Sequence, residues 1–284
     1  MLSARTCGRW LLTIIAMWLL VSGASAQEKV TLDEEQTRQR LALMEQTIAG
    51  FQVSSDAITA KSALTFATKP LLRYSDPTRG STEANVLLDA SVWRLGESGR
   101  PTALVTLEIY RSSGKESLLS YEFASLTEAR FSLHHKQHDK VAWQATGSAV
   151  TMTPLTGSPQ PARSVGGRLS QMRQLARQFA VHEKLRDGTA LECRLLAQPI
   201  DRYASSDGTI ADGAIFAFAN GTNPELGLLL ECDDKRWTYG AVRLSAAELA
   251  LELDGREVAN FPVGDFRSTS GTYSAAHHPI DLVR

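Results

Sequence analysis

This sequence has no excess of positive charge, few cysteines and few long apolar runs. The 284 residues carry 30 Lys and Arg against 31 Asp and Glu, with no basic cluster. A protein with this charge balance has no strong field to attract phosphate backbones or anionic lipids, so nucleic acid is not an expected partner. The three cysteines include no C-x-x-C pair, which removes the commonest zinc motif.

The first 26 residues are predicted to be a signal peptide. Arg5 and Arg9 precede an almost wholly apolar stretch over residues 11–21, and the small residues 24–26 then provide a cleavage site before Gln27. An apolar run of about 11 residues is too short to span a bilayer, which takes about 20. We therefore expect a protein exported to the periplasm or secreted, with no membrane span in the mature chain. A retained membrane anchor is the alternative.

Two cysteines, Cys193 and Cys232, remain after that cleavage. Each alternates with leucines in a predicted strand, on the apolar face. An even pair in an oxidising compartment can form a disulfide. Two buried thiols that act as small apolar side chains are the alternative, and the sequence leaves both open.

A pattern of one helix followed by several strands occurs twice. Each helix has apolar residues at offsets 0, 3, 7 and 10, which form one stripe. Each is followed by a strand, a Pro-x-x-Arg-Tyr segment, an apolar run that ends in Glu, and a final hairpin. The stripes are Leu41, Met44, Ile48 and Phe51, and Leu169, Met172, Ala176 and Phe179; the prolines are Pro70 and Pro199, and the glutamates are Glu108 and Glu231. Matching periods of this kind indicate an internal duplication.

The sequence therefore predicts an α+β fold of two tandem related units, each with one helix packed on an antiparallel sheet of five or six strands. Turn-forming residues place hairpins at 97–100, 220–223 and 254–255. The expected segments are the first unit at 27–153, a Gly-, Pro- and Ser-rich linker at 154–167, the second unit at 168–263, and a polar tail at 264–284, mobile or lightly docked.

Histidines gather at two places. His134, His135 and His138 fall at a predicted turn beside lysines, and His277 and His278 lie in the polar tail. A zinc site needs ligands that converge from a rigid frame. We interpret both groups as solvated, and we expect no metal and no cofactor.

Catalytic motifs are incomplete. His182-Glu183 would begin a zinc-protease helix, but position 186 is Arg186 where a second His is required. Ser98 lies in a Gly-Glu-Ser-Gly segment without the closing Gly of a nucleophile elbow. The sequence assigns no catalytic residue and leaves open whether the protein is an enzyme.

The two Arg-Tyr pairs are the candidate ligand-binding residues. Arg73-Tyr74 and Arg202-Tyr203 occupy the same place in the two repeats, where each repeat could present a guanidinium and a phenol to a ligand. The alternative is structural: the tyrosine packs in the core and the arginine caps its strand.

These segments, together with residues 169–179 and the stretch from Asp212 to Glu225, resemble an uncharacterised family of exported, planctomycete-type bacterial proteins. The resemblance covers most of the mature chain and implies a shared fold and export, without an activity. It is looser at residues 90–93. The resemblance identifies no catalytic residues in this sequence.

The leading hypothesis is an exported, non-catalytic module that binds a small ligand, a glycan or an envelope protein. It rests on export, balanced charge and the missing reaction machinery. The alternatives are an exported hydrolase with an unrecognised site and a structural cell-envelope protein.

Overall fold

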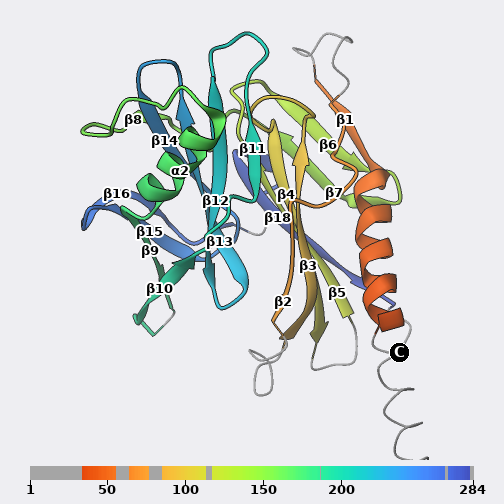
Figure 1. Cartoon of the computed structure of the whole chain (residues 1–284). Helices are drawn as coiled ribbons and strands as arrows, with labels where there is room; N and C mark the ends of the chain where they lie inside the picture. The colour runs from red at the N-terminus through yellow and green to blue at the C-terminus, as the bar shows by residue number, and fades with distance from the viewer. Residues whose placement is uncertain are drawn as a thin grey trace, which may run out of the picture. The chain divides into compact units, whose positions relative to one another are not determined.

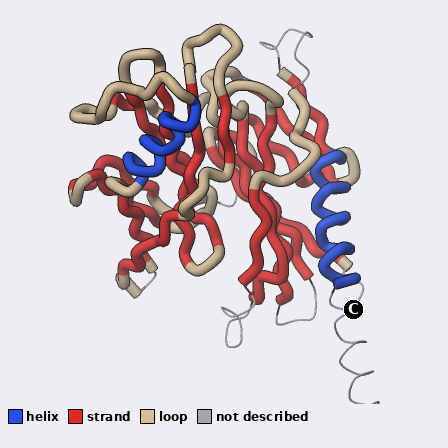
Figure 2. Tube along the Cα trace, viewed as in Figure 1, coloured by secondary structure: helices blue, strands red, loops and turns tan. Residues whose placement is uncertain are grey.

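The computed structural model describes residues 34–55, 64–76, 85–112, 117–185, 187–265 and 268–281. The predicted signal peptide lies outside these ranges. Most of the described residues are in strands, as Figures 1 and 2 show. The helical segments in these ranges are residues 34–50 and α2 (Val165–Ala176). Neither is long and apolar enough to cross a membrane.

One five-stranded antiparallel sheet contains most of the N-terminal strands. Its order is β18-β5-β4-β3-β2. Its strands are β2 (Leu72–Asp76), β3 (Asn85–Leu95), β4 (Ala103–Ser112), β5 (Ser117–Ser125) and β18 (Tyr273–Ile280).

A four-stranded sheet has the order β1-β6-β7-β17. Its strands are β1 (Phe51–Ser54), β6 (Phe131–His135), β7 (His138–Ala145) and β17 (Ser270–Gly271). The short β17 pairs with β7 in parallel, and the other pairs are antiparallel.

The C-terminal strands form a nine-stranded sheet of order β16-β15-β9-β10-β12-β13-β14-β8, with β11 also paired to β12. Its strands are β8 (Thr153–Pro154), β9 (Phe179–Lys184), β10 (Ala190–Leu195), β11 (Asp201–Tyr203), β12 (Asp212–Asn220), β13 (Asn223–Cys232), β14 (Trp237–Arg243), β15 (Glu248–Leu253) and β16 (Arg256–Phe261).

Hairpin turns form at all three places where the turn residues predicted them, including residues 97–100 between β3 and β4. Asp254 and Gly255 join β15 to β16 with φ of 49° and 74°. Positive φ at both central residues defines the type I′ turn, whose twist suits a two-residue hairpin. Gly221, with φ of 62°, lies in the turn between β12 and β13.

The predicted α+β class is wrong: the fold is mostly β, and its sheets pack on each other. Almost every residue of β12 and β13 is buried, whereas a sheet with one covered face would alternate. Ile215, Leu229 and Val242 of the nine-stranded sheet share one core with Val92 and Leu104 of the five-stranded sheet. The two sheets therefore do not belong to separate helix-on-sheet units, because each covers a face of the other.

The second face of β12 and β13 packs against α2. Ser164 caps this helix by accepting a hydrogen bond from the Gly167 amide. Met172 and Leu175 of the helix are buried in a core with Phe216 of β12. The helix covers part of one sheet face and leaves most of the core to strands.

The N-terminal strand set (β1 to β7) and the C-terminal strand set (β9 to β16) share pairings in the same register. Arg73 lies opposite Ser91 in β2–β3, as Arg202 lies opposite Ala214 in β11–β12. Further along, Glu108 lies opposite Ala90 and Glu231 opposite Gly213; Leu107 faces Tyr121 and Leu230 faces Tyr239. Equivalent sequence positions thus occupy equivalent places in the two strand sets.

The C-terminal residues differ from the expected loose tail. All eight residues of β18 pair with β5, from Tyr273 opposite Ala124 to Ile280 opposite Ser117. Ser274 and Ala275 are buried. The segment is thus the edge strand of the five-stranded sheet, although its sequence has little apolar periodicity.

Candidate functional site

The two candidate arginines make equivalent ion pairs. Arg73 donates from Nε and Nη2 to the two carboxylate oxygens of Asp89, at 2.9 and 2.5 Å. Arg202 donates in the same way to Asp212, at 3.0 and 2.6 Å. Hydrogen bonding to Asp89 raises the pKa of Arg73. These contacts fit the structural alternative, in which each arginine secures the end of a strand; ligand binding by the arginines stays a prediction.

The two candidate tyrosines also make equivalent contacts. The Tyr74 hydroxyl donates to Glu108 Oε1 at 3.0 Å, and the Tyr203 hydroxyl donates to Glu231 Oε1 at 2.7 Å. Both tyrosines are buried. Burial raises the pKa of each phenol well above its usual range, and the adjacent carboxylate raises it further.

The surroundings of the two glutamates differ. Glu108 accepts a second hydrogen bond from the Tyr110 hydroxyl at 2.8 Å, and burial raises its pKa. The carboxylates of Glu122 and Glu225 are also buried in this region. Glu231 instead pairs with an arginine that is partly exposed.

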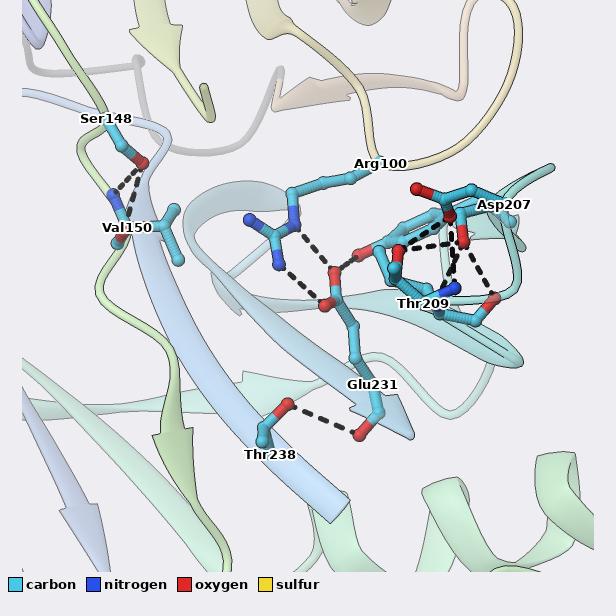
Figure 3. A network of polar contacts seen from close by, with 10 residues as sticks. Arg100, Ser148, Val150, Asp207, Thr209, Glu231 and Thr238 are labelled. Carbon is cyan, nitrogen blue, oxygen red and sulfur yellow. Dashed lines mark hydrogen bonds and ion pairs between the residues drawn. The ribbon is translucent and has the colours of Figure 1, made fainter. Parts of the chain in front are cut away.

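Arg100 is that arginine. Its Nε donates to Glu231 Oε1 at 2.7 Å and its Nη2 to Oε2 at 2.6 Å. The Arg100 side chain is 27% exposed and that of Glu231 is 5% exposed. Figure 3 shows the remaining guanidinium nitrogen directed away from Glu231. It makes no hydrogen bond with the described residues, so it can donate to a ligand.

A cavity of about 790 Å³ opens beside this pair. Its size falls within the usual range of small-molecule sites. Six hydroxyl side chains line it together with Arg100, Glu128, Glu231 and five apolar residues. The hydroxyl residues are Thr102, Thr127, Ser148, Thr151, Thr209 and Thr238, and the apolar residues are Pro101, Leu126, Val150, Met152 and Ile210.

Both strand sets contribute to this polar cavity. Arg100 belongs to the turn between β3 and β4, Ser148 and Thr151 to the segment before β8, and Thr238 to β14. Figure 3 shows Ser148 and Thr238 on the side of the Arg100–Glu231 pair away from Thr209. Hydroxyl groups both donate and accept hydrogen bonds, so the lining matches a ligand that carries both kinds of group.

A buried arginine holds the Arg100 turn in place. Arg94 donates to the backbone oxygens of Gly96 and Gly99, at 2.7 and 2.8 Å. It also donates to Asp201 Oδ2 in β11, at 2.7 Å. Arg94 thereby ties the turn before Arg100 to β11, the strand that contains Tyr203.

The histidine groups are not simply solvated. His135 is 4% exposed, and its ring centroid lies 4.8 Å from that of His138, which in turn lies 4.0 Å from that of His278. Burial lowers the pKa of His278 to about 4, and the neighbouring imidazoles lower it further. His134 and His277 are exposed, as interpreted. Within the described ranges, no three His, Cys, Asp or Glu side chains are placed to hold a metal ion.

Cys193 and Cys232 lie as buried thiols in the core beside α2. Burial raises the pKa of Cys232 to about 11, and a thiol held in that form is a weak nucleophile. This arrangement fits the alternative of two buried apolar residues, and the disulfide stays a prediction.

Comparison with family models, with curated proteins and with solved structures gives no match to this chain. The site is therefore defined by its own geometry. Sequence reasoning identified Tyr203 and noted Glu231 as the end of an apolar run, but it missed Arg100, which lies 131 residues from Glu231. No motif spacing links residues so far apart.

Proposed function

We propose that this chain is an exported, non-catalytic binding protein whose polar cavity holds a neutral, hydroxyl-rich ligand such as a segment of a glycan. The observation that carries the proposal is the set of six hydroxyl side chains that line a cavity of about 790 Å³ beside the Arg100–Glu231 pair. Ser148, Thr209 and Thr238 also hydrogen-bond to neighbouring protein atoms, and the Thr151 side chain is exposed. Such a lining offers paired donors and acceptors, which sugar hydroxyls require.

The charges of the polar cavity favour a neutral ligand. Its lining has one cationic side chain, Arg100, and two anionic ones, Glu128 and Glu231. An anionic ligand would meet more negative than positive charge. A neutral ligand can accept from Arg100 and donate to the exposed Glu128.

The contacts of Glu231 support binding over catalysis. Both carboxylate oxygens already accept hydrogen bonds, from Arg100 and Tyr203. A general base must be within hydrogen-bond reach of a proton on the substrate, and here the carboxylate instead orients a guanidinium. Export and membership of the planctomycete-type family are part of the same proposal. We also propose an internal duplication, which the shared registers of the two strand sets support.

Calorimetric titration of the mature protein with neutral oligosaccharides tests the proposal. Thr151→Val removes an exposed hydroxyl of the cavity, and Thr156→Val makes the same change on an exposed threonine that does not line it. One lost hydrogen bond costs about 0.5–1.5 kcal/mol, so Thr151→Val should weaken binding by about two- to tenfold. Thr156→Val should leave the affinity unchanged.

The proposal fails if no neutral oligosaccharide binds or if the two valine variants bind alike. Incubation of the same sugars with the protein, followed by an assay of reducing ends, distinguishes a hydrolase from a non-catalytic binding protein. If the protein produces new reducing ends and a Glu128→Gln variant does not, the protein is a hydrolase and the non-catalytic proposal is wrong.

A further inference from the structure

A second cavity, with a different chemistry, lies at the end of the first helix. It has a volume of about 490 Å³ and opens between the C-terminal turn of residues 34–50, β1 and the segment around Phe66. Its walls are mainly apolar and aromatic. The apolar lining includes Ile48, Phe51, Val53, Phe66 and Trp93.

Two polar side chains of this apolar cavity, Trp93 and Thr65, already have partners inside the protein. The Trp93 indole N–H donates to Ser91 Oγ at 2.8 Å. The Thr65 hydroxyl donates to Glu97 Oε1 at 2.7 Å. A ligand in the cavity therefore gains little from hydrogen bonds to these groups, and apolar burial has to provide most of its binding free energy.

The aromatic walls are fixed by their neighbours. Phe51 is 8% exposed and packs against Phe66, with ring centroids 5.9 Å apart, and against Phe123 at 5.7 Å. Trp93 is 1% exposed. Because the Phe51 and Trp93 rings are buried, this wall of the cavity is preformed, which lowers the cost of ordering side chains on binding.

One charged side chain, Glu45, lies on the lining of the apolar cavity and is exposed. Its carboxylate repels an anionic head group and tolerates a neutral or cationic one. We propose that this cavity binds the hydrocarbon chain of an alkyl or acyl ligand whose head group is not anionic. The inference is independent of the polar cavity, which shares no lining residue with this one.

Binding of the neutral dye N-phenyl-1-naphthylamine, followed by its fluorescence, tests the proposal on the mature protein. Ala49→Phe fills the cavity from an exposed helix position, and Ala204→Phe makes the same change at an exposed alanine outside it. Ala49→Phe should weaken dye binding at least about tenfold, or ~1.4 kcal/mol, whereas Ala204→Phe should not. If Ala49→Phe lowers the melting temperature, Thr68→Phe, which fills the same cavity from the opposite wall, replaces it in the test.

Displacement of the dye by 12-carbon chains tests the head-group preference. Dodecanol should displace the dye about two- to fivefold better than dodecanoate at low salt, and Glu45→Gln should remove that difference. Failure of the dye to bind, or equal loss of binding in the Ala49 and Ala204 variants, would overturn the proposal. A preference for dodecanoate would also overturn it.

Discussion

Glu122 provides the sharpest test of how buried charge affects this fold. Its side chain is 7% exposed, and Oε2 has no hydrogen-bond partner of normal geometry among the described residues. Burial raises the pKa of Glu122 well above its usual range, and the carboxylates of Glu108 and Glu225 raise it further; Tyr273 and Arg243 act in the opposite direction. The folded protein therefore holds a proton on Glu122 more tightly than the unfolded chain does.

The sign of the pH dependence follows from that difference. A raised folded-state pKa contributes stability below the unfolded pKa, about 4.3 for glutamate, and loses it as the pH rises through the folded pKa. Between the unfolded-state and the folded-state pKa of Glu122, this one group lowers the free energy of unfolding by up to about 1.4 kcal/mol per pH unit. Glu122→Gln carries no titrating proton, so it should be more stable than the wild type near pH 8 and gain little near pH 4.

Urea denaturation of the wild type and of Glu122→Gln, at steps from pH 4 to pH 8, measures the difference. Glu128→Gln, the same change at an exposed glutamate, is the control and should follow the wild type. A ΔΔG of 1 kcal/mol should appear in thermal melts as about 2–4 °C for a chain of this size. Parallel pH curves for Glu122→Gln and the wild type would refute the reasoning.

Two further predictions concern the frame around the polar cavity and the core beside α2. Arg94→Met should destabilise the protein by about 3–5 kcal/mol in urea, because it leaves Asp201 buried without its partner; Arg236→Met, in an exposed pair with Asp233, should change stability by less than about 0.5 kcal/mol. Equal costs would contradict the positioning role of Arg94. The buried thiols should resist the reagent DTNB in the native protein and react in urea, since only exposed thiolate is nucleophilic. Rapid native labelling would contradict their burial, and no labelling in urea without a reductant would show a disulfide.

Local features of the fold were predictable because local chemistry fixes them. Asp254 and Gly255 form the type I′ turn that their sequence favours. Met44 and Ile48 of the first apolar stripe are buried. The arrangement of the sheets was not predictable, because alternation shows which side chains share a face and does not show what covers that face.

The sites were harder to predict because they depend on distant residues. The sequence placed Tyr203 in a candidate site, but Arg100 reaches Glu231 only through packing of the two strand sets. His135 and His278 were assigned to separate solvated segments, and the pairing of β18 with β5 brings them to either side of His138. Long-range backbone pairing of this kind leaves little trace in a single sequence.

The central claim is that the polar cavity binds a neutral, hydroxyl-rich ligand. A crystal structure of the mature protein in complex with a neutral oligosaccharide tests this claim most directly. We expect sugar oxygens within hydrogen-bond distance of Arg100 Nη1 and of the Thr151 hydroxyl, with the Arg100–Glu231 pair retained. A sugar bound elsewhere, with the polar cavity holding only water, would contradict the assignment.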